Sequence, residues 1–336
     1  MKILLTGATG YIGKRLLIQL LSQGHTVICS VRDSMRFNSA KYKDAPGKIE
    51  VIENDFLDPQ SLSSIPHDID AAYYLIHSMS STEGDFSQME LQSATNFRQA
   101  LEQTSCKQVI FLTGIANNEQ LSKHLSSRLA VEHALESRVY GLTSLRAAII
   151  VGSGSASFEI IRDLVEKLPI MVAPRWLNTQ CQPIGIRNVM EFLVGVLGKE
   201  FTFNKTYDIG GKDILTYKEM LLQYAQVRGL TRHIITVPVM TPKLSSYWLY
   251  FITSTTYPLA KNLVDSMKID VVAKPNDLAS KLNISLYTIN KLSHMPLTKS
   301  NRMMCYPAGT ILFQTLFTRK MYGSTWKYLQ KAASRM

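Results

Sequence analysis

A glycine-rich stretch near the start of the chain is the feature that most restricts its fold. It reads Thr-Gly-Ala-Thr-Gly-Tyr-Ile-Gly over residues 6–13, follows an apolar run at 2–6 and precedes an amphipathic stretch at 11–22. Glycines at such positions allow a tight turn, a close approach of backbone to ligand, and close packing of helix on strand. Since the N–H groups that open a helix attract anions, the loop predicts a site for a dinucleotide pyrophosphate. Its expected contact residues are Gly7, Thr9, Gly10, Tyr11, Ile12 and Gly13.

Apolar runs of strand length alternate with stretches of helical period through the first 150 residues. This pattern predicts an α/β fold of the Rossmann type, a doubly wound parallel sheet with helices on both faces. The predicted strands are 2–6, 26–31, 49–52, 71–76, 108–113 and 142–146. The predicted helices are 11–22, 91–103, 126–136, 158–167, 189–197 with Asn188 as N-cap, and one from a Thr216-x-x-Glu219 capping box to Arg228. We divide the chain into a dinucleotide-binding domain at 1–150, whose core elements continue to about residue 230, and a smaller α/β substrate lobe at 151–336.

The residues after the second predicted strand bear on the choice of cofactor. An acidic residue there holds the ribose 2′-hydroxyl of NAD(H), whereas an arginine favours the 2′-phosphate of NADP(H). The sequence offers both, as Arg32 followed by Asp33, and adds Arg36 close by. Because a guanidinium can stack on adenine and pair with phosphate together, we expect NADP(H) rather than NAD(H).

Positive charge is concentrated in the last part of the chain. Residues 1–200 contain 19 basic and 20 acidic side chains, whereas residues 201–336 contain 18 and 6. Such an excess is typical of a surface that meets an anionic membrane or another acidic partner, or of a solvated basic face. We expect a peripheral contact with an anionic membrane through residues 230–336, with the solvated face as the alternative. No nucleic-acid partner is expected, because no helix-turn-helix or zinc signature accompanies the charge.

Cysteine spacing and the first residues predict the compartment. The four cysteines lie far apart, so no pair has the spacing of a zinc or dithiol site, and no metal is expected. Lys2 enters an apolar strand directly, without the pattern of a signal peptide. These features favour a cytoplasmic protein, with the peripheral membrane contact as an addition. They leave the oligomeric state open.

The loop at 6–13, together with Asn54-Asp55-Phe56 after the third predicted strand, resembles the extended and atypical short-chain dehydrogenase/reductase superfamily. Within it, the chain is similar to the NmrA-like NAD(P)H-binding group. The stretches at 77–79, 151–159, 174–176 and 207–211 also resemble a bacterial subgroup of oxidoreductase-like NAD(P)-binding proteins. The resemblance implies that Asp55 hydrogen-bonds the adenine amino group, that Phe56 lies beside the base, and that a loop containing His77 passes the cofactor ribose. It does not supply a substrate.

The helix that carries the catalytic pair in this superfamily departs from the usual pattern. Short-chain dehydrogenases place a tyrosine and, four residues later, a lysine on one helix face after the fifth strand. In this sequence those positions hold His124 and Arg128. We expect His124 to donate a proton to a substrate carbonyl, Arg128 to hold the nicotinamide ribose, and Thr113 to supply a hydroxyl.

Two kinds of function remain open on these residues. The first is an NADP(H)-dependent oxidoreductase acting on an apolar carbonyl or quinone, which the aromatic second lobe favours. The second is a non-catalytic NAD(P)(H)-binding redox sensor or an accessory protein of a membrane assembly, which the loss of the Tyr/Lys pair favours.

Overall fold

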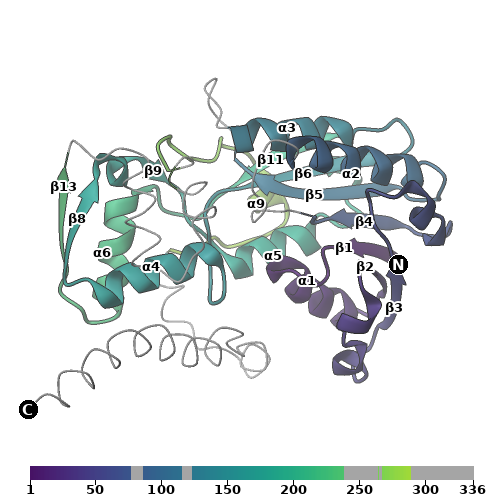
Figure 1. The fold of residues 1–336 in the computed structure, drawn as a ribbon, viewed down its shortest axis with the longest axis horizontal. Helices are drawn as coiled ribbons and strands as arrows, with labels where there is room; N and C mark the ends of the chain where they lie inside the picture. Colours follow the sequence, from purple (N-terminus) through teal and green to yellow (C-terminus); the bar gives the residue numbers. More distant parts are fainter. Residues whose placement is uncertain (77–85, 116–122, 238–263, 265–266, 289–336) are drawn as a thin grey trace, which may run out of the picture. The chain divides into compact units, whose positions relative to one another are not determined.

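Seven parallel strands form the central sheet, in the order β11-β6-β5-β4-β1-β2-β3 (Figure 1). The strands are β1 (Lys2–Thr6), β2 (Thr26–Val31), β3 (Lys48–Glu53), β4 (Ala71–Tyr74), β5 (Gln108–Gly114), β6 (Gly141–Ala147) and β11 (Lys205–Ile209). The order reverses between β1 and β4, which is the topological switch point of a doubly wound sheet. The Rossmann fold predicted from the sequence is confirmed.

The structure describes residues 1–76, 86–115, 123–237, 264 and 267–288. They all lie within one compact unit, Met1–His294. Residues 230–336, for which membrane contact is expected, are therefore described only in part. Within the described ranges, no helix is long and apolar enough to cross a membrane.

Alternating side chains of the first strand enter two separate cores, one on each face of the sheet. Ile3 and Leu5 pack with α1 (Tyr11–Ser22) and α5 (Ile186–Gly195). Leu4 packs on the opposite face, which is covered by α2 (Phe86–Leu101) and α3 (Lys123–Ala134). All three side chains are fully buried. Helices thus cover both faces, as the alternation of strands and helices predicts.

Part of the chain beyond residue 150 forms a second lobe with its own apolar core. There α4 (Ala156–Lys167) and α6 (Tyr217–Val227) pack against one face of a parallel pair, β8 (Ile170–Pro174) and β13 (His233–Val237). The predicted capping box is present, since Thr216 and Glu219 exchange side-chain and backbone hydrogen bonds at the start of α6. The shorter elements are β7 (Ile150–Val151), β9 (Gln180–Cys181), β10 (Ile184–Gly185), β12 (Leu215–Thr216) and α9 (Leu278–Lys281).

The start of α5 differs from the sequence prediction. The N-cap is Gly185 rather than Asn188, which is fully buried inside the helix. The Asn188 amide donates to Glu191 at 2.7 Å and to the Ser285 carbonyl at 2.9 Å, and its oxygen accepts from the Tyr287 N–H at 3.1 Å. The side chain therefore fixes a distant segment of the chain to α5. Asparagine suits both roles, and the local sequence does not distinguish them.

Candidate functional site

The backbone of the glycine loop leaves no room for side chains at Gly7 and Gly13. Gly7 has φ +66°, and a Cβ atom on it would lie 2.6 Å from the carbonyl oxygen of Leu75. The Gly10 N–H donates to the Gly7 carbonyl at 2.9 Å and closes the turn. A Cβ on Gly13 would overlap that same carbonyl. The loop is therefore compact enough for a ligand to approach its backbone directly.

The first turn of α1 presents backbone N–H groups to the loop. Its N-cap is Gly10, which has no side chain to cap these donors, and the first turn carries no acidic residue. Thr9 beside it is exposed. Uncapped donors at a positive helix end suit an anion, so the residues present fit the pyrophosphate of a dinucleotide.

A buried hydroxyl fixes where this loop begins. Thr6 Oγ1 donates to the Tyr73 carbonyl at 2.9 Å and accepts from the Leu75 N–H at 3.0 Å. Because Thr6 is fully buried, water does not compete for these hydrogen bonds. They join the ends of β1 and β4 at the switch point, directly under the glycine loop.

At the end of β2, the two residues that could contact the cofactor ribose, Asp33 and Arg32, differ in their interactions. Asp33 caps a short 3₁₀ helix, Ser34–Arg36: its carboxylate accepts from the backbone N–H groups of Met35 at 3.0 Å and Arg36 at 3.3 Å. It also pairs with the Arg36 side chain at 3.0 Å. Arg32 is exposed and makes no hydrogen bond or ion pair with any described residue. The acidic group is thus engaged, and the guanidinium of Arg32 is available.

The two residues expected at the adenine lie in different environments. Asp55 is exposed, and its carboxylate accepts from the Leu57 N–H at 3.0 Å. Phe56 is only 7% exposed, and its ring lies 5.6 Å from that of Phe97 in the core beneath α2. Asp55 remains accessible to a base, whereas Phe56 contributes mainly to packing. Both assignments stay predictions.

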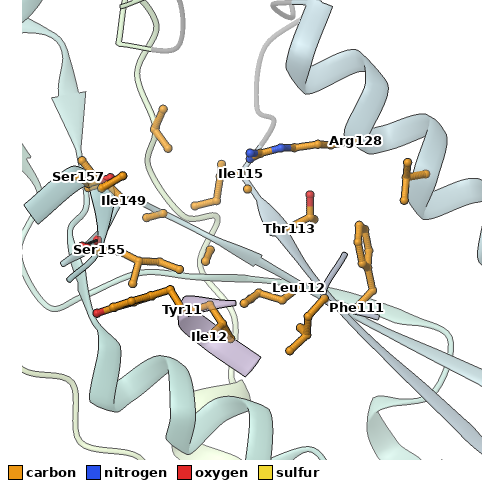
Figure 2. Close-up of a pocket in the computed structure, with 18 of the residues that line it drawn as sticks. Tyr11, Ile12, Phe111, Leu112, Thr113, Ile115, Arg128, Ile149, Ser155 and Ser157 are labelled. Atoms are coloured by element: carbon orange, nitrogen blue, oxygen red, sulfur yellow. Dashed lines mark hydrogen bonds between the residues drawn. The ribbon is translucent and has the colours of Figure 1, made fainter. Parts of the chain in front are cut away.

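A cavity of about 340 Å³ opens at the carboxyl ends of β4, β5 and β6, next to the first turn of α1 (Figure 2). Its wall is largely apolar and includes Ile12, Leu75, Leu112 and Ile149. Tyr217, from α6 of the second lobe, also lines it. Ligands of open parallel sheets bind at this edge, and the size suits part of a cofactor with a small apolar molecule.

The polar groups of the cavity include two predicted site residues, Thr113 and Arg128. Thr113 Oγ1 is buried and has no hydrogen-bond partner among the described residues. Figure 2 shows it directed toward the side on which Arg128 lies. The guanidinium rests against Gly114, where it fills the space that a Cβ atom would need. The structure therefore brings the Thr113 hydroxyl and the Arg128 cation to one end of the cavity.

Burial and a nearby carboxylate act in opposite directions on Arg128. Removal from water lowers the pKa of its guanidinium to about 10, while the negative charge of Glu90 raises it. Glu90 is held from α3, since its carboxylate accepts from Ser127 Oγ at 2.9 Å. The side chain still carries a positive charge near neutral pH and lines a mostly apolar wall.

The side chains of the two histidines of the predicted site, His77 and His124, lie outside the described residues. His124 belongs to α3, one turn before Arg128, but its side chain lies outside the described residues, and His77 lies outside them entirely. The sequence did not indicate Ser155, Tyr217 or Met267 as part of the cavity. No motif marks these residues, because only the packing of the second lobe brings them to the strand ends.

Comparison with known proteins agrees with this geometry. Residues 7–148 match a family described as NAD(P)H-binding. The photosystem II assembly factor Ycf39 of Trieres chinensis is 22% identical over 301 residues, 89% of this chain and 90% of that protein. The chloroplastic divinyl chlorophyllide a 8-vinyl-reductase of Oryza sativa subsp. indica is 23% identical over 281 residues, 80% of this chain and 68% of that protein.

Solved structures show the same fold over most of the chain. The triphenylmethane reductase of Citrobacter sp. in complex with NADP(H) superimposes with a TM-score of 0.68 at 21% identity, covering 87% of this chain and 99% of that one. The predicted resemblance is therefore confirmed. Residues 7–148 thus match the NAD(P)H-binding family, and the chain shares the fold of these solved structures over most of its length.

Proposed function

We propose that the protein is an NADP(H)-dependent oxidoreductase that reduces an apolar carbonyl or quinone-like substrate. One observation carries the proposal: in the mostly apolar cavity beside the glycine loop, the Thr113 hydroxyl, which has no hydrogen-bond partner among the described residues, faces the side that Arg128 occupies. A polar pair in an apolar enclosure orients a molecule that has one oxygen and little other polarity.

Each polar residue of the site has a separate role in such a reduction. A nicotinamide bound beside the glycine loop would supply a hydride to the carbonyl carbon, and the carbonyl π pair would then move onto oxygen. Thr113 Oγ1 donates a hydrogen bond to that oxygen, and Arg128 stabilises the negative charge that develops there. His124, one turn earlier on α3, is the proposed donor of the proton that completes the hydroxyl group.

NADP(H) is the proposed form of the cofactor. The support is the division of roles at the end of β2, where Asp33 is engaged as a helix cap and Arg32 is not engaged. A guanidinium at this place pairs with a phosphate bidentately, which a carboxylate cannot do.

The test is NADPH oxidation with a panel of quinones and apolar aldehydes. Thr113→Val, which keeps the shape of the side chain and removes the hydroxyl, is expected to lower kcat by about a hundredfold, as loss of one oxyanion donor does. Thr113→Ser is the matched control and should keep most of the rate. Both variants should bind NADPH as the wild type does. An unchanged rate in Thr113→Val would refute the assigned role, and His124→Ala tests the proton donor in the same assay.

The second candidate function is a redox sensor or an accessory protein without turnover. The replacement of the usual Tyr/Lys pair by His124 and Arg128 supports it. So does the likeness to an assembly factor over most of the chain. Tight NADPH binding with no turnover on any member of the panel would favour this function over the enzyme.

A further inference from the structure

The parallel pair β8–β13 has an apolar outer face. Ile170 and Val172 of β8 and Ile235 of β13 are 60%, 48% and 56% exposed. Val172 and Ile235 are register partners, so the three side chains stand on one face of the pair. We call these three residues the β8–β13 strip.

The opposite face of the same strands explains why the strip is not part of a core. Met171, Ala173 and Ile234 alternate with the strip residues and are buried against α4 and α6. That face contributes its side chains to the core of the second lobe. Parallel strands are usually apolar on both faces because both faces are covered, whereas the strip residues of this pair are exposed. The apolar outer face therefore needs another explanation.

Basic residues surround the strip at both ends of the strands. Segments 166–176 and 228–237 together contain four basic side chains and one acidic side chain, Glu166. Of the four, Lys167 pairs with Asp163 of α4 at 3.0 Å. Arg228 pairs with Glu166 at 3.1 Å. Arg232 donates from Nε to the Val165 carbonyl, and so keeps its charge without a carboxylate partner there. Arg175 follows β8 directly and is exposed.

We propose that the β8–β13 strip docks the protein on an anionic lipid surface. Exposed aliphatic side chains between basic ones match a bilayer interface, where the apolar groups enter the acyl boundary and the cations meet lipid phosphates. A second copy fits less well, because a twofold contact through this face would bring the same positive charges together.

The proposal is tested by sedimentation of the full chain with phosphatidylcholine vesicles, with and without phosphatidylglycerol. The wild type should sediment with the anionic vesicles only. Ile170→Thr/Val172→Thr/Ile235→Thr keeps β-branched side chains on the strands and should lower the partition coefficient about tenfold. Arg175→Gln should lower it about fivefold, as expected for one basic residue at an anionic surface.

Controls separate docking from misfolding. Val139→Thr/Ile214→Thr alters two aliphatic residues that are exposed to a similar degree, 56% and 52%, outside the strip. It should bind vesicles as the wild type does, and every variant should keep its NADPH affinity. Equal binding of the triple variant and this control would overturn the proposal, as would sedimentation with neutral vesicles to the same extent. A lipid-independent dimer that the triple variant abolishes would assign the strip to a second copy.

Discussion

The guanidinium of Arg128 occupies the space in which a side chain at Gly114 would lie. Gly114→Ala is therefore expected to displace the cation from the end of the cavity while leaving the glycine loop untouched. Displacing a group that is aligned with a substrate by about 1 Å lowers kcat/KM about a hundredfold. Steady-state kinetics, with NADPH affinity measured in parallel, will check it. Gly195→Ala is the control, because only the flexible end of Leu282 lies near its Cβ.

Gly7 and Gly24 form a matched pair for testing the cofactor loop. Both have positive φ, +66° and +79°, so alanine costs about 1–2 kcal/mol of backbone strain at either position. Only Gly7 also has a neighbour in the way, the Leu75 carbonyl, whereas nothing lies within 4 Å of a Cβ on Gly24. Calorimetric titration should show weaker NADPH binding for Gly7→Ala and unchanged binding for Gly24→Ala. Equal losses would mean that the loop does not contact the cofactor.

Arg32→Ala should discriminate between the two cofactors. Loss of a charged hydrogen-bond donor to the 2′-phosphate is expected to raise the Kd for NADPH at least about tenfold and to leave that for NADH nearly unchanged. Arg36→Ala, which removes an exposed guanidinium already paired with Asp33, provides the control. Parallel titrations with both cofactors measure the difference. An equal effect on both would contradict the role given to Arg32.

Glu132 ties the helix that carries Arg128 to the sheet. It is 5% exposed, accepts two hydrogen bonds from Arg146 of β6 at 2.9 and 3.1 Å, and accepts one from Thr206 of β11 at 2.7 Å. Glu132→Ala leaves Arg146 without its carboxylate and should lower the free energy of unfolding by about 3 kcal/mol. Glu136→Ala removes an exposed carboxylate nearby and should change it by less than about 1 kcal/mol. Urea denaturation of the two variants checks the contrast.

The elements around the glycine loop could be predicted almost to the residue. The predicted strands 2–6 and 26–31 and the helix 11–22 coincide with β1, β2 and α1, because strand period, helix period and glycine punctuation agree there. The crossover helices were found with their ends displaced by several residues. Strand β11 was not predicted, since the first two of the five residues of Lys205–Ile209 are polar and exposed, which leaves too short an apolar run. Its place in the sheet comes from pairing with β6, which is a long-range contact.

The candidate site was predictable only where a motif carries it. The loop at 6–13 and the pair Thr113 and Arg128 follow from position relative to strands and from family resemblance. The contribution of Tyr217 depends on how α6 packs, and that is set by contacts between segments far apart in the chain. The capping role of Asp33 likewise depends on a 3₁₀ turn that the sequence did not indicate.

Strand β6 is synthesised well before its neighbour β11. When β6 leaves the ribosome its outer edge has no partner, and α4, β8 and α5 must be synthesised before β11 completes the sheet. An open parallel edge is a template for unwanted pairing during that interval. We therefore expect the newborn chain to be prone to aggregation while the second lobe is being synthesised.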